Sequence, residues 1–243
     1  MVIFSPVTKI FPNGDEVLSK LDFHITAGQM VIITGKSGSG KTTIGRLLIG
    51  DLQPTEGSIS VDGENIVGAK QKDLIPLRRK IGTVFQDYKI IPDKTTYENI
   101  ALNLEVASFP KDEINDKVEK ILEIVGIPSK KHLFPSQLSG GELQRASLAR
   151  AVATEPHILF ADEPTGNLDK VTSKEIFELL KKINKAGTTV IIATHNQDLL
   201  DLGKLHHISL DKGKIVKDTH PSKKKSVKTK DSQPKTATKK KKK

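Results

Sequence analysis

A glycine-rich run between an apolar segment and a helical pattern constrains the fold of this chain more than any other sequence feature. The run GKSGSGKT occupies positions 35–42, directly after the apolar residues 30–34 (MVIIT) and before the pattern TTIGRLLIG. It matches the phosphate-binding loop G-x-x-x-x-G-K-[ST] at every fixed position. A flexible Gly/Ser loop would explain the glycines but not the Lys-Thr pair. We therefore predict a nucleotide phosphate site where a strand leads into a helix, because the first amides of a helix can bind an anion.

Each residue type in this run has a predicted role. The glycines let backbone amides turn towards phosphate oxygens, and Lys41 neutralises the charge of the β- and γ-phosphates. The hydroxyl of Thr42 is a predicted ligand of Mg²⁺. A nucleoside triphosphate with Mg²⁺ is thus expected here, and the predicted nucleotide-binding residues of the loop are Gly35, Lys36, Ser37, Gly38, Ser39, Gly40, Lys41, Thr42 and Thr43.

A second group of candidate residues follows the apolar run at 157–162 (HILFAD), which is a predicted strand. Asp162 would lie at the carboxyl end of this strand beside the phosphate-binding loop, where its carboxylate can help to hold Mg²⁺. Glu163 is placed to orient and polarise a water molecule for attack on the γ-phosphate. An Asp-Glu pair after a strand is by itself more often a solvated loop, but the upstream phosphate-binding loop favours the catalytic interpretation.

The remaining pattern is that of an α/β fold. Near-continuous apolar runs, typical of strands covered on both faces in a parallel sheet, lie at 30–34, 81–85, 157–162 and 188–194. The region 2–25 and a hairpin at 208–216 are predicted as antiparallel strands at the margin of that sheet. We therefore predict a P-loop α/β domain over 1–218, with a mixed-sheet core and an antiparallel β margin.

A helical subdomain is predicted from about 90 to 155. Thr95 and Glu98 have the spacing of a capping box, which opens a helix. Apolar residues recur at helical spacing across 111–125, and Gly126 is placed to end that helix. We expect this mostly helical stretch to form a lobe separate from the sheet.

Charge is distributed unevenly along the chain. The net charge is +10, with 39 Lys and Arg against 29 Asp and Glu. The segment 219–243 holds 11 lysines and one acid, Asp231, which leaves 28 basic and 28 acidic residues in 1–218. This segment has too few apolar residues to offset the entropy of ordering, so we predict a disordered tail. The high net charge therefore describes the tail and not the body.

Cysteine and long apolar runs are absent from the sequence. Without cysteine the chain has no disulfide framework, thiolate metal site or cysteine nucleophile, and nothing requires an oxidising compartment. No apolar run approaches the roughly 20 residues needed to cross a bilayer, and the N-terminus does not resemble a signal peptide. We expect a cytosolic protein that is neither inserted nor exported by its own sequence.

The run LSGGE at 138–142 carries a family resemblance. It is similar to the signature motif of ATP-binding-cassette (ABC) ATPases, and it lies shortly before the Asp-Glu strand. The resemblance implies a homodimer in which ATP is bound between two copies of the chain, arranged head to tail. In that geometry the amides near Ser139, Gly140 and Gly141 face the γ-phosphate held by the other copy.

Four further positions match elements of that family in the expected order. Phe11 matches the aromatic residue that stacks on adenine; tyrosine is common there, but stacking needs only the ring face. The resemblance implies that Gln86 is the Q-loop residue, a catalytic residue and a Mg²⁺ ligand. Asp169, in the run GNLD, matches the D-loop at the nucleotide, and His195 matches the catalytic switch histidine.

Within the family the chain looks most like the FtsE-type cell-division ATPases. The stretches FQDYKIIP at 85–92 and TYEN at 96–99 carry this resemblance, together with ADEPTGNLD and ATHN further on. It implies a peripheral ATPase on the cytoplasmic face of the cell membrane, coupled to an integral membrane partner of the FtsX type. In that family the output regulates cell-wall hydrolysis at the septum. Lipoprotein-releasing and macrolide-exporter ATPases share the ADEPTGNLD run and remain the alternative.

Other classes of ATPase fit less well. A DNA-repair or chromosome-structuring ATPase would need a long coiled-coil insertion between the phosphate-binding loop and the signature, and the interval here is too short. A translation-associated ATPase normally carries two cassettes, and this chain has one. A non-catalytic adaptor would be expected to lack Glu163 or His195, and both are present.

The lysine-rich tail has no counterpart in the family pattern. It could be a solvated tail, a nucleic-acid arm or a tether to the anionic membrane surface. It lacks aromatic residues and arginine, so no specific nucleic acid is expected. Attraction to an anionic leaflet is worth about 1 kcal/mol per lysine near the surface. We hypothesise a membrane tether, with the solvated tail as its alternative.

Overall fold

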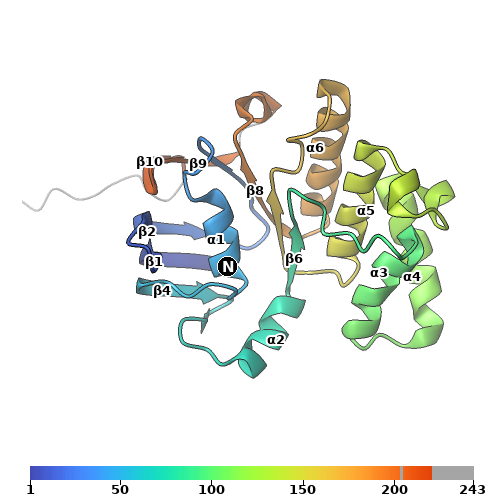
Figure 1. The fold of residues 1–243 in the computed structure, drawn as a ribbon, viewed down its shortest axis with the longest axis horizontal. Coiled ribbons are helices and arrows are strands. Elements are labelled where there is room, and N and C mark those ends of the chain that lie inside the picture. The colour runs from blue at the N-terminus through green and yellow to red at the C-terminus, as the bar shows by residue number, and fades with distance from the viewer. Residues whose placement is uncertain (203–204, 221–243) are drawn as a thin grey trace, which may run out of the picture.

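The computed structural model describes residues 1–202 and 205–220 of the chain (Figure 1). Within these residues the strands form one sheet of six strands and one of four. The α/β class expected from the sequence is confirmed, because the larger sheet consists mainly of parallel strands. No helix in the described part of the chain is both long enough and apolar enough to cross a membrane.

The six-stranded sheet contains all four apolar runs of the sequence. Its strands, in spatial order, are β10 (Lys214–Asp218), β9 (His206–Asp211), β3 (Met30–Thr34), β8 (Thr189–Thr194), β7 (Ile158–Asp162) and β6 (Ile81–Val84). Only β10 pairs antiparallel, so the predicted hairpin lies at the margin as expected. The carboxyl ends of β3, β6, β7 and β8 meet at one edge, where loops from several strands can build a single site.

The smaller sheet is separate from the core sheet, whereas the sequence pattern had placed its N-terminal strands at the core margin. Its order is β2 (Glu16–Ile25), β1 (Val2–Ile10), β4 (Glu56–Val61) and β5 (Glu64–Asn65), all antiparallel. The reason is α1 (Lys41–Leu48), whose apolar residues share one buried cluster with residues of both sheets. Helix α1 therefore lies between the two sheets (Figure 1).

A close approach brings α1 against the core sheet. A Cβ atom added at Gly45 would lie 2.3 Å from the ring of Phe160 on β7. On the other side, the rings of Phe4 and Phe23 stack at 4.7 Å within the same buried cluster. Because the phosphate-binding loop leads directly into α1, this packing holds the loop against the core.

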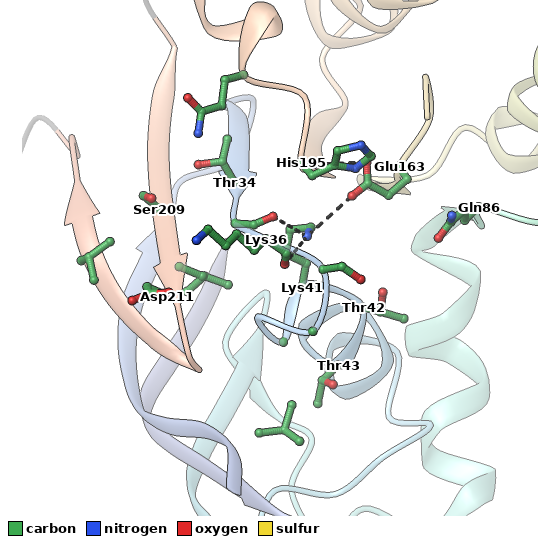
Figure 2. Close-up of a pocket in the computed structure, with 18 residues that line it drawn as sticks. Thr34, Lys36, Lys41, Thr42, Thr43, Gln86, Glu163, His195, Ser209 and Asp211 are labelled. Carbon is green, nitrogen blue, oxygen red and sulfur yellow. Dashed lines mark hydrogen bonds and ion pairs between the residues drawn. The ribbon is translucent and has the colours of Figure 1, made fainter. Parts of the chain in front are cut away.

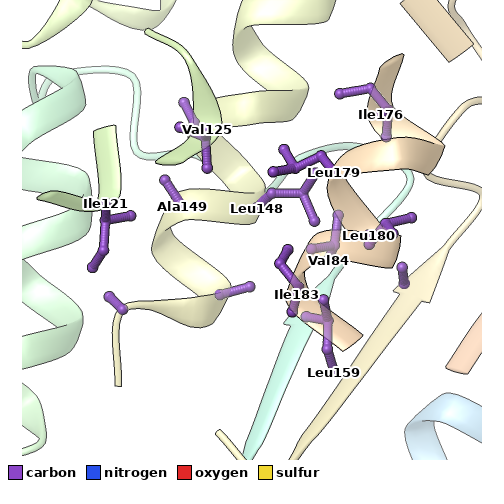
Figure 3. Close-up of a cluster of buried hydrophobic side chains, with 14 of the residues drawn as sticks. Val84, Ile121, Val125, Leu148, Ala149, Leu159, Ile176, Leu179, Leu180 and Ile183 are labelled. Atoms are coloured by element: carbon purple, nitrogen blue, oxygen red, sulfur yellow. The ribbon is translucent and has the colours of Figure 1, made fainter. Parts of the chain in front are cut away.

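Helices cover the other face of the core sheet. They are α3 (Thr96–Val106), α4 (Lys111–Val125), α5 (Gly140–Val152) and α6 (Lys170–Lys185), while α2 (Gln71–Arg79) packs with the α1 side. Leu148 of α5 and Leu180 of α6 lie in one buried cluster with Val84 of β6 (Figure 3). Helices α3 to α5 fall within the predicted lobe. The predicted capping box at Thr95 and helix stop at Gly126 are confirmed.

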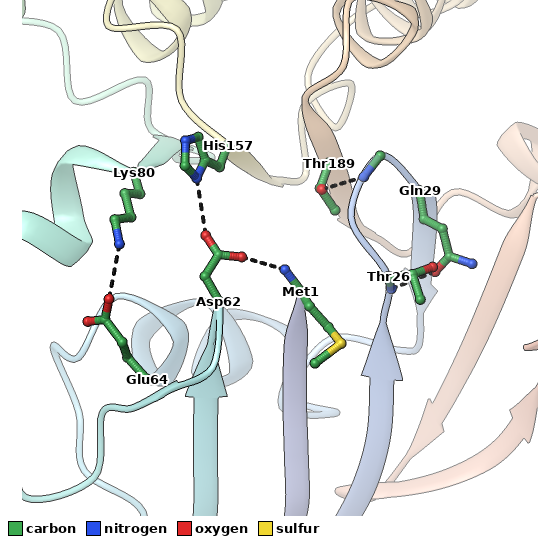
Figure 4. A network of polar contacts seen from close by, with 9 residues as sticks. Met1, Thr26, Gln29, Asp62, Glu64, Lys80, His157 and Thr189 are labelled. Atoms are coloured by element: carbon green, nitrogen blue, oxygen red, sulfur yellow. Dashed lines mark hydrogen bonds and ion pairs between the residues drawn. The ribbon is translucent and has the colours of Figure 1, made fainter.

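Polar contacts connect the smaller sheet to the core (Figure 4). The carboxylate of Asp62, in the turn between β4 and β5, contacts the amino group of Met1 and lies 3.1 Å from Nδ1 of His157. Glu64 of β5 forms an ion pair with Lys80 at 3.2 Å, just before β6. These contacts join the edge of the smaller sheet to the ends of β6 and β7 that lie away from the predicted site.

The described chain continues for two residues beyond β10. The amide of Thr219 donates to the carbonyl of His207 at 3.0 Å, and His220 is buried, with its ring 3.9 Å from the ring of His24. The first two residues of the predicted tail therefore pack against the body. The rest of that predicted tail, 221–243, lies outside the described residues.

Candidate active site

A pocket of about 910 Å³ opens at the edge where the core strands end (Figure 2). Its lining brings together Thr34 of β3, the phosphate-binding loop and the residues that directly follow β7 and β8. The sequence-predicted residues that line it are Gly35, Lys36, Ser37, Gly38, Gly40, Lys41, Thr42, Thr43, Gln86, Glu163 and His195. Segments separated by up to 160 positions in the sequence therefore meet where the sequence analysis expected them.

The N-terminus of α1 is prepared for an anion. Its N-cap, Gly40, has a φ of 101°, a conformation that favours glycine, and no side chain caps the helix. A Cβ atom at Gly40 would lie 2.4 Å from Cδ2 of Leu18 on β2. The first turn contains no acidic residue. The first turn of α1, which no side chain caps, and the positive end of the helix dipole therefore lie at the pocket, as a phosphate group requires.

Lys41 is buried at the floor of this pocket. Its Nζ donates to the carbonyls of Gly35 at 2.7 Å and Lys36 at 3.1 Å, and it lies 3.6 Å from Oε1 of Glu163. The ammonium group is thus held by the loop itself and by one carboxylate. A bound polyphosphate would offer Lys41 stronger, charged acceptors at the same place.

Glu163 is held where β7 and β8 end. Its Oε2 accepts hydrogen bonds from the Thr194 hydroxyl at 3.0 Å and from the His195 amide at 3.2 Å, and it lies 2.9 Å from Nδ1 of His195. Its φ of 49° turns the chain out of the strand, and its amide donates to the carbonyl of Ala193. The carboxylate is almost fully buried, whereas the His195 side chain is 59% exposed and lies at the pocket entrance.

Asp162 and Thr42 form a candidate Mg²⁺ site behind the loop. Asp162 is buried, and its Oδ1 has no hydrogen-bond partner among the described residues. Burial raises the pKa of Asp162, while a hydrogen bond from the Thr42 hydroxyl opposes that shift. Mg²⁺ at nucleotide sites usually takes one or two protein oxygens and completes its shell with phosphates and water. The unpaired oxygen of Asp162 beside a hydroxyl fits that requirement.

Gln86 reaches the pocket from the loop after β6. Its side chain is exposed and lines the pocket, on the side opposite Ser209 and Asp211 in Figure 2. Tyr88 and Lys89, two and three residues further on, both have left-handed φ values, of 58° and 49°. Left-handed non-glycine residues are strained by about 1–3 kcal/mol each. The loop that carries Gln86 is therefore held by its surroundings.

Several predicted nucleotide-binding residues do not line this pocket. Phe11 is half-buried with Nζ of Lys9 5.3 Å from its ring centre, and Val17 of β2 lines the pocket on that side instead. Ser39 is buried within the loop. The roles predicted for Phe11 and Ser39 stay predictions.

The signature residues lie elsewhere in the same chain. Ser139 caps α5 in a capping box with Glu142, whose carboxylate also lies 3.0 Å from Nζ of Lys130. The Ser139 amide and hydroxyl and Lys130 lower the pKa of Glu142 to about 2. Asp169 caps α6 by accepting from the amides of Val171 and Thr172. Neither Ser139, Gly140, Gly141 nor Asp169 lines the pocket formed by the phosphate-binding loop of the same chain.

Some pocket residues were not foreseen from the sequence. Val17 comes from β2, Ser209 and Asp211 come from β9, and Val216 comes from β10. No motif marks them, because each belongs to an ordinary strand pattern and reaches the pocket only through the arrangement of the two sheets. A capping pattern S-x-x-E at 139–142 could have identified the polar contacts of Ser139.

The comparisons with known proteins agree with this geometry. The family model for ABC transporter proteins matches residues 18–166, which is more than half of the chain. The chain belongs to the ABC transporter family. As a member of that family, it is an ATPase of the cassette type, and the phosphate-binding loop and Glu163 lie in its matched region.

Curated relatives of this ABC ATPase cover most of the chain. A protein from Streptococcus pneumoniae named "Cell division ATP-binding protein FtsE" is 43% identical over 212 residues, covering 87% of this chain and 92% of the relative. Proteins of the same name are 40% identical in Bacillus subtilis, covering 90% and 96%, and in Escherichia coli, covering 88% and 97%.

Solved structures show the same fold. The ATP-binding cassette MJ0796, described as a dimer in a post-hydrolysis state bound to ADP and Pi, is 34% identical with a TM-score of 0.83, covering 90% of this chain and 97% of the other. The protein cbiO1 from Clostridium perfringens is 30% identical with a TM-score of 0.82, covering 89% and 87%. The ABC cassette fold is thus established for this chain.

Proposed function

We propose that this ABC ATPase is the ATP-hydrolysing subunit of an FtsEX-like membrane complex in cell division. In this proposal, ATP-driven dimerisation acts on a membrane partner and thereby regulates hydrolysis of the septal cell wall. The observation that carries the chemistry is the buried Glu163 carboxylate, held by Thr194 and His195 and 3.6 Å from Lys41. The cell-division assignment is supported by relatives of that name at 40–43% identity.

The site residues divide the reaction among them. Glu163 accepts a proton from the attacking water, whose oxygen bonds to the γ-phosphorus as the bond to the β-phosphate bridging oxygen breaks. Lys41 stays protonated and stabilises negative charge on the transferred group. His195 orients Glu163 and lines the part of the pocket where the γ-phosphate would lie. The products are ADP and inorganic phosphate.

Thr42, Asp162 and Gln86 are the residues that would hold Mg²⁺. The ion supplies charge neutralisation at the β- and γ-phosphates when bound. Thr42 and Asp162 lie next to each other, and Gln86 lines the same pocket. Mutation of Asp162 is therefore expected to weaken the dependence of ATP binding on Mg²⁺.

We also propose a head-to-tail homodimer as the active form. In one chain the signature residues Ser139, Gly140 and Gly141 are not part of the pocket that Lys41 lines. A second copy would bring them, together with Asp169, to the γ-phosphate side of that pocket. A dimeric solved structure of a 34% identical cassette supports this arrangement.

The proposed place of action is the cytoplasmic face of the cell membrane. An FtsX-like integral membrane subunit would receive the mechanical output. Copurification from native membranes with ATP present would identify the partner: an FtsX-like protein is expected, whereas a permease of the lipoprotein-releasing or macrolide-exporter type would replace this proposal by its alternative.

The lysine-rich segment is proposed to add an electrostatic contact with anionic lipid. A chain cut after His220 keeps the packed residues and removes the lysines. It is expected to retain ATPase activity and lose salt-sensitive cosedimentation with anionic liposomes. A full-length control with the tail lysines changed to glutamine should behave in the same way. Liposome binding by either variant would exclude the tether.

The substitution Glu163→Gln tests the catalytic assignment. It keeps the shape of the side chain and removes the base, so steady-state ATPase activity should fall by about 10²-fold or more. ATP binding should persist, and an ATP-bound dimer should accumulate in light scattering. Glu155→Gln, at an exposed position, is the control. Hydrolysis by Glu163→Gln at a near wild-type rate would show that the assignment is wrong.

A further inference from the structure

The loop between β6 and α3 has a backbone that its own sequence does not favour. Tyr88 and Lys89 are consecutive, carry side chains and both have left-handed φ values. A Cβ atom disfavours this conformation at one residue and more so at two in succession. Such a conformation persists only where surrounding contacts hold it. It occurs two positions after Gln86, which lines the pocket.

Helix α5 supplies those contacts through Arg150. The guanidinium donates from Nη2 to the carbonyl of Tyr88 at 2.9 Å and from Nη1 to the carbonyl of Lys89 at 2.5 Å. The buried hydroxyl of Ser147, one turn earlier on α5, donates to the same carbonyl of Tyr88 at 3.3 Å. One planar side chain thus holds both left-handed residues with charge-assisted hydrogen bonds.

The two flanks of the loop are fixed as well. Upstream, β6 is paired with β7 in the core sheet. Downstream, Asn99 of α3 accepts from the amide of Ile91 at 2.8 Å and donates to its carbonyl at 3.0 Å. Between these anchors, Arg150 contacts the described loop close to Gln86. The orientation of Gln86 therefore depends on where α5 lies relative to the core sheet.

Helix α5 also carries the signature motif. Ser139 is its N-cap, and Arg150 lies three turns further along the same helix. A rigid helix joins the end proposed to face a second copy's nucleotide to the residue that holds the Gln86 loop. A shift of α5 would carry the carbonyls of Tyr88 and Lys89 with it.

We propose that Arg150 is a positioning residue for Gln86, which couples the signature end of α5 to the hydrolytic pocket. The inference rests on the proposed function, in which Gln86 takes part in hydrolysis. Arg150 does not touch the nucleotide in this proposal. Arg150 fixes the position of the Gln86 loop. Contact of α5 with the second copy would therefore also fix the orientation of Gln86.

The test compares Arg150→Ala with the wild-type chain at full length. Its kcat for ATP is expected to fall at least tenfold, while the equilibrium Kd for ATP changes less than twofold, because the phosphate-binding loop is untouched. Arg150→Lys should recover only part of the loss, because an ammonium group keeps the charge but lacks the rigid planar arrangement of donors with which the guanidinium reaches both carbonyls.

Arg145→Ala is the matched control on the same helix. Arg145 also donates to a backbone carbonyl, that of Val125 at 2.6 Å, and pairs with Glu175, but it does not contact the Gln86 loop. It should keep kcat within about twofold. Equal loss of kcat in both arginine variants would reduce the role of Arg150 to general support of α5 and overturn the proposal.

A double variant separates positioning from folding. If Arg150 acts through Gln86, Gln86→Ala with Arg150→Ala should be no slower than Gln86→Ala alone. If instead the double variant shows the product of the two separate losses in kcat, the proposal is wrong. If wild-type hydrolysis is absent or Glu163→Gln remains active, the proposed function itself fails. If Glu163→Gln is inactive and Arg150→Ala is fully active, only this inference fails.

A spectroscopic measurement reads the loop directly. The chain has no cysteine, so Asp87→Cys provides a single site for a nitroxide label next to Gln86. The label should become more mobile when Arg150→Ala is added and stay unchanged when Arg145→Ala is added. Unchanged mobility in the Arg150 variant would contradict the proposed contact, whether or not that variant is less stable.

Discussion

Two helices begin at glycine-rich motifs, and they are prepared differently for an anion. Helix α1 follows Gly40 with no side-chain cap and no acid in its first turn. Helix α5 follows Ser139 in a complete capping box, with the carboxylate of Glu142 in its first turn. Free amides at a helix start bind anions, whereas a capping box occupies donors and adds negative charge.

The difference indicates an order of events. The start of α1 can bind a phosphate in a single chain, because its amides and Lys41 face an open pocket. At the start of α5, the charge of Glu142 opposes an anion and is offset in part by Lys130 at 3.0 Å. We therefore expect nucleotide to bind first at the start of α1. The start of α5 should contact a nucleotide only after the phosphate-binding loop of another copy has bound it.

The largest expected effect distinguishes ATP binding by a single chain from turnover, which requires two copies. Lys41→Ala removes a charged phosphate contact, which is worth about 1.5–3 kcal/mol, so the Kd of the isolated chain for ATP should rise roughly 10- to 100-fold. Ser139→Arg should leave that Kd unchanged and abolish turnover. Equilibrium binding and steady-state ATPase assays measure the two quantities. Weaker ATP binding by monomeric Ser139→Arg would show that the start of α5 contributes to nucleotide binding within one chain, which contradicts the expected difference between the two helices.

Mixing the two variants sharpens the same point. A heterodimer of Lys41→Ala with Ser139→Arg retains at most one intact composite site, so activity should recover to no more than half of the wild-type value and depend on protein concentration. The separate variants serve as controls. Full activity from a strictly monomeric sample would exclude action between copies.

A smaller effect concerns stability at the two helix starts. Gly40→Ala forces a left-handed residue with a Cβ atom against Leu18, so it should cost about 1–3 kcal/mol and lower Tm by roughly 2–4 °C per kcal/mol. Gly140→Ala is the matched control at α5, because its added Cβ would lie 3.5 Å from the nearest atom, of Leu168. Calorimetry should show little change for Gly140→Ala. Equal losses would mean that the two starts are similarly constrained.

The smallest effect is the pH dependence of the α5 cap. The folded chain lowers the pKa of Glu142 to about 2, from the usual 4.5, so its stabilising contribution is complete above about pH 4.5 and is lost as pH falls towards 2. The Tm difference between wild type and Glu142→Gln should shrink over that interval. The corresponding difference in the free energy of unfolding should stay below about 1 kcal/mol, because the Glu142 side chain is partly exposed.

Glu98→Gln provides a control for this measurement. Glu98 completes the same type of capping box with Thr95 at the start of α3. Its contacts lower its pKa too, so a loss in the same direction is expected. A Tm difference at Glu142 that grows as pH falls would contradict the assigned direction of the shift.

The motifs of the pocket were predictable because each is local and ends a parallel strand. Glycines and Lys41 at fixed spacing define the phosphate-binding loop, and Asp162 with Glu163 follows a buried run. Parallel strands bring their carboxyl ends to one edge, so His195 after β8 and Gln86 after β6 had to lie near that loop. How near each residue lies to the loop still depends on strand order, because neighbouring strands are about 4.8 Å apart.

Other features had no local signal. The segments that form β4, β5 and α2 were not assigned, and Pro76 lies inside α2, where it weakens any helical pattern. Val17 reaches the pocket, whereas Phe11 does not line it. Both lie in or beside the same hairpin, and their distance from the pocket depends on how the smaller sheet packs over α1, which the sequence pattern of the hairpin does not encode.

The sequence by itself determined which residues are candidates for the site, their order along the chain and the strand or helix end near which each lies. Only the tertiary structure decided the contacts between distant segments: the Lys41–Glu163–His195 cluster and the Arg150 contacts with Tyr88 and Lys89. Motifs act through spacing within a few residues. These contacts join segments 30 to 120 positions apart, and their distances follow from sheet register and helix packing, which depend on the whole buried core.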